Sequence, residues 1–183
     1  MSDVARLMDV WFGWHVHFGT RIARSWTPSP TPDREIEEAR LKLGGPGWPE
    51  EILDLYRWSD GDYSRLFPFG TFAPIESVAN TMSGGYEEWD LFLEEEPEGE
   101  VPNPFPLLIS PEYPCIHIDR TGLTPGRMWA MDIGDFFPMA NSFTEYLELC
   151  IYMAEQGQVA REESGGYLVF PYHDSRWGPA SRT

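Results

Sequence analysis

The chain has 183 residues, a length that suits one domain with short extensions and that can bury a hydrophobic core without a disulfide scaffold. Its 30 acidic residues outnumber its 13 basic ones, and the formal net charge of −17 disfavours binding to nucleic acid or to an anionic membrane. The sequence contains no run of about 18 apolar residues that would predict a membrane span. Its N-terminus lacks the pattern of a signal peptide, so a cytoplasmic location is expected.

The first predicted element is an amphipathic helix over residues 2–23, where apolar side chains recur at a spacing of about 3.6 residues. Residues 25–32 follow as a stiff, proline-rich connector. His15 and His17 are two positions apart, so on a helix they diverge and cannot share a metal ion. The helix either docks on the rest of the chain or offers a surface to a partner, and docking is the simpler interpretation.

Two short helices are predicted next, over residues 33–43 and 49–58. The first is followed by a Gly-Gly-Pro sequence, which is typical of a helix C-terminus. The second begins with Pro49 in its first turn and ends at the Ser-Asp-Gly turn of residues 59–61. None of these residues forms a catalytic constellation, and this part of the chain is interpreted as a scaffold for binding.

Short strands and helices alternate through the rest of the chain. Strands or extended segments are predicted at residues 66–69, 72–75, 107–109, 115–118, 128–131, 136–140 and 167–172, and helices at residues 76–82, 86–96 and 143–156. Ser142 is expected to cap the last helix, with Glu145 completing a capping box. The order of elements favours an α+β fold with a central antiparallel β-sheet of about four to six short strands flanked by helices.

The net charge is unevenly distributed along the chain. Residues 1–48 hold six basic and six acidic side chains, so residues 49–183 carry the whole charge of −17. Residues 86–100 are rich in Asp and Glu and contain no Lys or Arg. Because acidic residues steer a basic partner, the predicted partner-binding residues are Glu87, Glu88, Trp89, Asp90, Glu94, Glu95 and Glu96. The alternative is a solvated face that only promotes solubility.

Few other residues suggest chemistry. Asp132 and Asp135 follow a predicted strand, and paired carboxylates can perform acid–base catalysis or bind a metal, but a turn is the simpler interpretation. Cys115 and Cys150 are expected to be free, buried thiols. No phosphate-binding loop, zinc-protease or serine-hydrolase motif occurs in the sequence. We therefore expect no catalysis, no cofactor and no metal ion.

Four segments match, in order and spacing, the pattern of a known family. They are residues 36–44, residues 48–61, residues 105–109 with 116–119, and residues 126–132 with 140–147. These segments resemble the first helix, the proline-started helix, the central strands and the final strand-to-helix unit of the SMI1/KNR4 family, within the SUKH superfamily. Residues 111–114 depart from the family pattern, because Pro-Glu-Tyr-Pro stands where a glycine-rich turn is common.

The resemblance spans residues 33–155 and suggests three segments. They are an N-terminal helix with its connector at residues 1–32, an SMI1/KNR4-like domain at residues 33–157, and a C-terminal extension at residues 158–183. Bacterial members of the family are often cytoplasmic immunity proteins that neutralise a cognate toxin, and many of those toxins are nucleases or deaminases.

The resemblance therefore implies that this chain binds a toxin with a basic surface and blocks it by stoichiometric occlusion. A regulatory or scaffold module without a toxin partner is the alternative, because other family members act in that way. A third hypothesis is an enzyme that uses Asp132 and Asp135.

Overall fold

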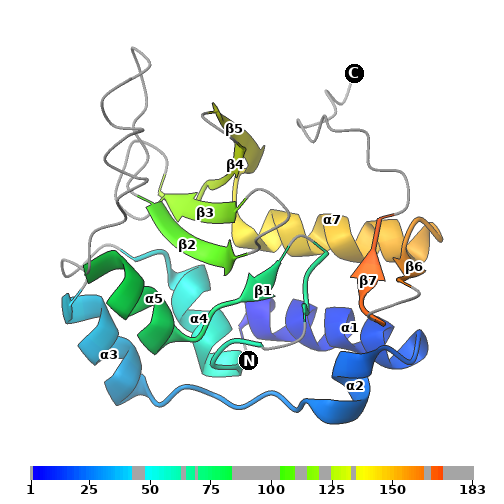
Figure 1. The fold of residues 1–183 in the computed structure, drawn as a ribbon, viewed down its shortest axis with the longest axis horizontal. Helices are drawn as coiled ribbons and strands as arrows, with labels where there is room; N and C mark the ends of the chain where they lie inside the picture. Colours follow the sequence, from blue (N-terminus) through cyan, green and yellow to red (C-terminus); the bar gives the residue numbers. More distant parts are fainter. Residues whose placement is uncertain are drawn as a thin grey trace.

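The computed structural model describes residues 2–42, 48–62, 65–68, 70–83, 104–109, 115–119, 125–132, 135–162 and 166–170 (Figure 1). The helices are α1 (Asp3–His17), α2 (Arg21–Ser25), α3 (Asp33–Lys42), α4 (Glu50–Trp58), α5 (Ile75–Ser83) and α7 (Phe143–Glu155). The strands are β1 (Thr71–Phe72), β2 (Pro104–Ile109), β3 (Cys115–Asp119), β4 (Met128–Asp132), β5 (Asp135–Ala140), β6 (Ala160–Arg161) and β7 (Leu168–Val169). The chain is a mixture of helices and antiparallel strands, as the predicted α+β class requires.

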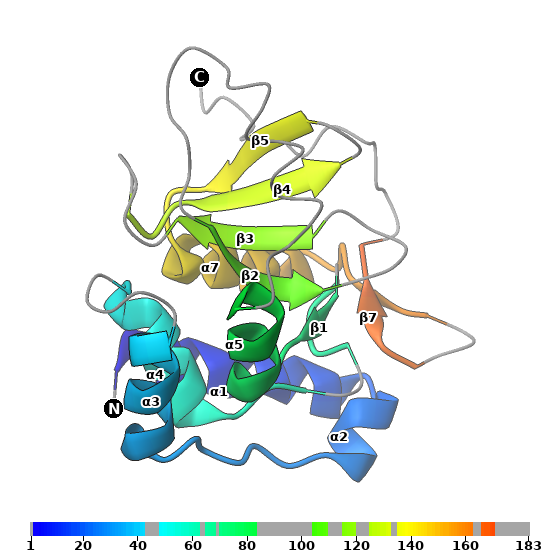
Figure 2. The same cartoon turned by 60° about the vertical axis from the view of Figure 1, so that its left-hand side comes forward.

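Strands β1 to β5 form an antiparallel sheet in which the spatial order follows the chain order (Figure 2). Ala130 on β4 lies between Ile116 on β3 and Phe137 on β5, which sets the register of the three strands. Strands β6 and β7 pair in a separate two-stranded sheet. Strand β7 covers Leu168 and Val169 of the strand predicted at residues 167–172, whose last two residues lie outside the described part of the chain.

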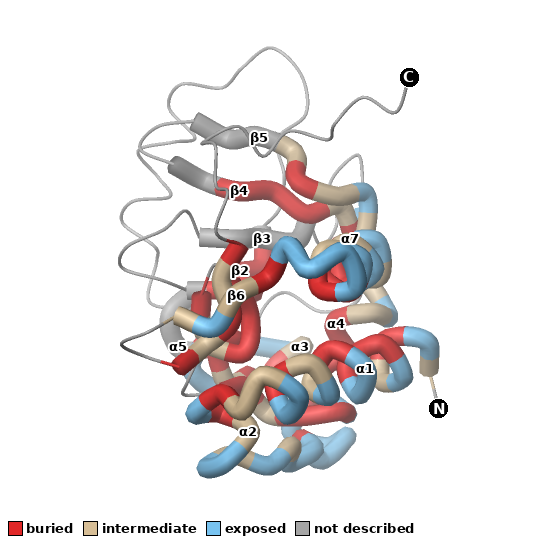
Figure 3. The backbone as a smooth tube through the Cα atoms, turned by 90° about the vertical axis from the view of Figure 1, so that its right-hand side faces the viewer, coloured by how far each residue is buried: buried red, intermediate tan, exposed pale blue. Residues whose placement is uncertain are grey.

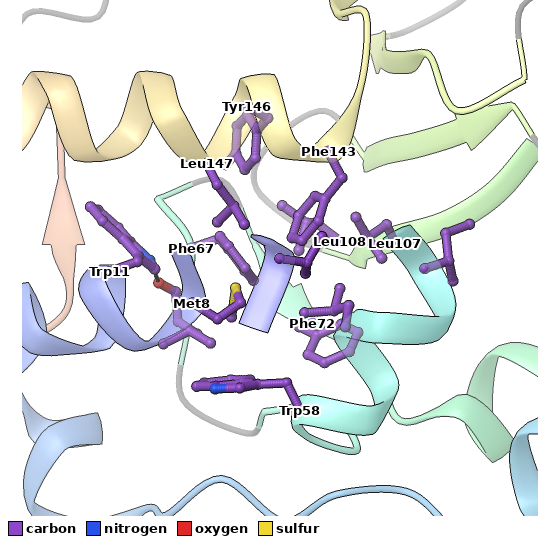
Figure 4. Packing of buried hydrophobic residues seen from close by; sticks show 14 of the residues in the cluster. Met8, Trp11, Trp58, Phe67, Phe72, Leu107, Leu108, Phe143, Tyr146 and Leu147 are labelled. Carbon is purple, nitrogen blue, oxygen red and sulfur yellow. Dashed lines mark hydrogen bonds between the residues drawn. The ribbon is translucent and has the colours of Figure 1, made fainter. Parts of the chain in front are cut away.

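One hydrophobic cluster joins α1, α4 and α7 to the sheet, and it includes Met8, Trp11, Phe72, Phe143 and Leu147 (Figure 4). These five side chains have no exposed surface. Complete burial of a large apolar side chain stabilises a fold by roughly 1.5–3 kcal/mol. The N-terminal helix therefore packs into the same core as the rest of the chain, with α1 lying beside α7 (Figures 1 and 3).

The single helix predicted over residues 2–23 is wrong, because α1 ends at His17 and α2 begins at Arg21. Gly19 between them has φ = +60°, a left-handed conformation that ends a helix and that glycine adopts without strain. The hydroxyl oxygen of Thr20 then accepts a hydrogen bond from the Ala23 N–H and caps α2. The apolar spacing continues across the break because Ile22 is also buried in the core.

The Ser-Asp-Gly turn after α4 holds two neighbouring elements. The Asp60 carboxylate accepts a hydrogen bond from the N–H of Ile75, the first residue of α5, at 2.9 Å. Asp62 accepts one from the N–H of Phe72 at 2.7 Å. Gly61 has φ = +76°, and a Cβ atom there would lie 2.6 Å from the backbone nitrogen of Pro74. This turn is therefore a structural joint between α4, β1 and α5.

The N-terminus of α7 is capped from two directions. The Ser142 hydroxyl accepts the Glu145 N–H at 3.0 Å, as predicted. The Glu145 carboxylate accepts instead from the backbone and side chain of Asn141, so the reciprocal half of the predicted capping box is wrong. Glu51 of α4 reaches across to accept from the N–H groups of Phe143 and Thr144 and from the Thr144 hydroxyl. A carboxylate at this end of a helix also interacts favourably with the helix dipole.

Candidate functional site

The predicted partner-binding residues lie outside the residues that the structure describes. They are Glu87, Glu88, Trp89, Asp90, Glu94, Glu95 and Glu96, and their role stays a prediction. Asp132 and Asp135 are cross-strand neighbours at the end of β4 and the start of β5, a backbone placement that fits a turn. The structure does not describe their side chains, so catalysis by this pair also stays a hypothesis.

His15 belongs to the core. Its exposed fraction is zero, its Nε2 donates to the Leu66 carbonyl at 2.8 Å, and its Nδ1 lies 3.1 Å from the Thr20 hydroxyl. The Trp11 indole N–H donates to the same carbonyl at 2.8 Å. Burial lowers the pKa of His15 to about 4, so the ring is neutral near pH 7. His15 thus has a structural role, and His17 on the same helix is exposed.

Cys150 is a buried free thiol on α7. Burial raises its pKa to about 12, which keeps it protonated near pH 7. A protonated, buried thiol is a poor nucleophile. The expectation for Cys150 is confirmed, whereas the side chain of Cys115 is outside the description.

A groove of about 410 Å³ opens between α1, the connector and α4. In Figure 1 the connector runs back from α2 to α3 below α1 and α4. The groove is lined by Ser2, Ala5, Asp9, Pro28, Pro30, Asp54, Arg57 and Trp58. Ser2, which caps α1, and the α1 residues Ala5 and Asp9 recur at i, i+3 and i+7, so they share one face of that helix. Trp58 forms part of the lining and also contacts the rings of Phe12 and Trp26.

The charges around the groove are unequal. Arg57 donates to Asp33 at 3.1 Å, Glu50 at 2.7 Å and Asp54 at 3.1 Å, and these carboxylates raise the pKa of its guanidinium, with Glu50 contributing most. Asp9 adds a further carboxylate, which accepts the Trp58 indole N–H at 2.8 Å. Asp33 and Glu50 contact Arg57 but do not line the groove, so the lining holds two carboxylates and one guanidinium and is net negative.

A second acidic surface lies on the outward side of α7. Four exposed side chains, which we call the α7 outer face, recur there at helical spacing: Glu145, Glu148, Tyr152 and Glu155. Tyr152 is 55% exposed, and the helix contains no Lys or Arg. Figure 3 shows the opposite side of α7 buried. The surface therefore combines negative charge with one projecting aromatic ring.

The sequence interpretation did not identify either of these surfaces. The α7 outer face could have been found by plotting residues 143–155 on a helical wheel, because its members are local in sequence. The groove had no such signal, because its three walls come from α1, the connector and α4, and only their packing brings Asp9 near Asp54 and Arg57.

Comparisons with known proteins give no family assignment. No family model matches the chain, and no curated protein matches it. Among the described residues, no three His, Cys, Asp or Glu side chains are grouped as metal ligands would be. Within the same part of the chain, every helix is too short or too polar to cross a membrane.

Proposed function

We propose that this chain is an immunity protein that binds a cognate bacterial toxin with a basic surface and blocks it by stoichiometric occlusion. The resemblance of residues 33–155 to the SMI1/KNR4 family supports the proposal. We also propose that the five-stranded sheet and its flanking helices correspond to the architecture of that family.

The observation that carries the proposal is the α7 outer face. Three glutamates on it attract a basic partner over a distance and raise the rate of association. Tyr152 projects between Glu148 and Glu155, and tyrosine is enriched among the residues that dominate binding energy at protein interfaces. The same helix therefore offers both the charge that speeds encounter and a ring that can hold the complex.

The anchoring of α7 also suits a binding surface. Its inward side places Phe143, Tyr146, Leu147 and Cys150 in the core, and Glu51 caps its first turn. A rigid surface loses little conformational entropy when it binds. Occlusion of a toxin active site needs this property, because the inhibitor must remain bound for as long as the toxin is present.

The test begins with capture of the partner by the full chain, followed by mass spectrometry. The captured protein is then expressed with and without this chain, and growth of the cells is measured. We expect the chain to restore growth at a one-to-one ratio. Capture of a protein that is not toxic would contradict the immunity function and favour a regulatory or scaffold module.

Charge reversal tests the surface. Glu148→Lys with Glu155→Lys should lower the association rate by about tenfold at low salt, because both charges lie on the docking side. Glu35→Lys with Glu38→Lys on α3 changes the charge equally and should lower it by no more than about twofold. Equal losses would show that only net charge matters. Reversal across Glu87–Glu96 tests the acidic segment in the same assay.

A further inference from the structure

We propose that the groove between α1, the connector and α4 receives one arginine side chain of the protein partner. The inference rests on the proposed protein-binding function, and it names the chemistry that the partner must present. Two carboxylates, those of Asp9 and Asp54, line the groove with one guanidinium, that of Arg57, so the charge of the lining is net negative. A cationic side chain is therefore the complementary occupant.

Two carboxylates that line the groove are already oriented. Oδ1 of Asp9 accepts the Trp58 indole N–H at 2.8 Å, and Oδ1 of Asp54 accepts from Arg57 at 3.1 Å. No described residue donates a hydrogen bond to the second oxygen of either side chain. Each aspartate thus keeps an acceptor for an incoming donor, and its existing bond restricts the side chain before binding. Such preorganisation lowers the entropic cost of binding.

The groove also has apolar walls. Ala5, Pro28, Pro30 and Trp58 line it beside the two aspartates. Arginine fits this combination, because its aliphatic stem packs on apolar surface while its planar guanidinium offers several donors to carboxylates. Lysine has a single ammonium group and matches two carboxylate acceptors less well. A volume of about 410 Å³ is near the lower end of the range for ligand sites, so it suits one long side chain rather than a large ligand.

The positive charge of Arg57 does not strongly repel an incoming arginine. Its guanidinium donates to three carboxylates, and it holds Asp54 in place at the groove. Ala5 is the small residue that leaves the groove open on the α1 side. Charge and shape can therefore be changed separately, the first at Asp9 and Asp54 and the second at Ala5.

The experiment titrates the full chain with three blocked tripeptides, Ac-Ala-Arg-Ala-amide and its Lys and Gln counterparts. Binding is followed by the NMR signal of the Trp58 indole N–H, which the Trp58→Phe variant identifies. We expect the Arg peptide to shift this signal saturably, and the Gln peptide to bind at least about tenfold more weakly. Equal binding of the Lys peptide would overturn the assignment to arginine.

Three variants test the site itself. Asp9→Asn with Asp54→Asn keeps the Oδ1 acceptors and should weaken the Arg peptide at least about fivefold. Ala5→Phe should abolish binding with every charge retained. Glu35→Gln with Glu76→Gln removes the same charge from two exposed positions outside the groove, one on α3 and one on α5, and should change binding by less than about twofold. Equal weakening in this control, or undiminished binding to a folded Ala5→Phe variant, would overturn the inference.

The outcomes separate this inference from the proposed function. If the Asp9→Asn, Asp54→Asn variant neutralises the toxin as well as the wild type does, the groove inference fails and the immunity function stands. If the peptide binds as expected but no toxin is found, the immunity function fails while the arginine site remains. Sedimentation of the free chain identifies a second copy as the occupant if the Ala5→Phe variant converts a dimer to a monomer, and that result would also overturn the inference.

Discussion

His15 and Arg57 are at the centres of two polar clusters that differ in what surrounds them. His15 is completely buried, contacts the Leu66 carbonyl and the Thr20 hydroxyl, and has its pKa lowered by burial. Arg57 is exposed and is surrounded by carboxylates that raise its pKa. The buried cluster satisfies its own hydrogen bonds and serves the fold. The exposed one leaves carboxylate oxygens available, so it can serve recognition.

The largest expected effect comes from removing the ring beside His15. Trp11→Ala should lower the free energy of unfolding by about 4 kcal/mol, because a fully buried indole is lost and the Leu66 carbonyl loses a donor. Urea denaturation measures the change. Val16→Ala on the exposed side of the same helix should cost less than about 0.5 kcal/mol. Similar losses for the two variants would contradict the role assigned to the buried cluster.

The pH dependence of stability should come next in size. The pKa of His15 is near 6.5 in the unfolded chain and about 4 in the folded one, so the unfolded chain binds a proton first as pH falls. The stability that depends on the neutral His15 ring is fully present above pH 6.5. The free energy of unfolding should fall by about 3 kcal/mol from this source as pH falls to about 4.

Comparison with His15→Gln isolates this contribution, because the carboxylates titrate in both proteins and cancel in the difference. Denaturation curves between about pH 7 and about pH 4 provide the measurement. His17→Gln, at an exposed position on the same helix, should retain the wild-type slope. An unchanged slope in His15→Gln would show that the buried ring does not control the acid response.

Glu51 is intermediate between the buried His15 and the exposed Arg57, since it is half-buried and joins α4 to α7. Glu51→Ala should lower the free energy of unfolding by about 2 kcal/mol, because two N–H groups and a hydroxyl at the start of α7 lose their acceptor. Glu50→Ala, its exposed neighbour, should cost less than about 1 kcal/mol. Thermal unfolding distinguishes these outcomes, and equal shifts would argue against the cross-helix cap.

The smallest expected change in stability is at Arg57. Its ion pairs are exposed to solvent, so Arg57→Gln should change the free energy of unfolding by no more than about 1 kcal/mol. The same variant removes the only cation lining the groove among the described residues. Binding of the Ac-Ala-Arg-Ala-amide peptide should therefore tighten or stay constant. Weaker binding would mean that Arg57 mainly positions Asp54.

Local pattern was enough to predict most helices. The helix predicted at residues 143–156 is observed as α7, and its residues at helical spacing, Phe143, Tyr146, Leu147, Cys150, Ile151 and Ala154, are all buried. Ser142 was correctly identified as the cap. These features depend on residues within a few positions of one another. The break at Gly19 was missed because the apolar spacing continues through it and the glycine adopts its left-handed conformation only where the chain turns.

Sequence alone determined the acidic character of this protein, its α+β class and the inward faces of its helices, because each depends on residue type and short-range spacing. The tertiary structure decided the partners of its polar groups. Glu51 lies in the first turn of α4, yet its carboxylate caps α7, which begins 92 positions later. Asp9, Asp54 and Arg57 form a groove only because α1 and α4 pack side by side, a contact that no local pattern in the sequence records.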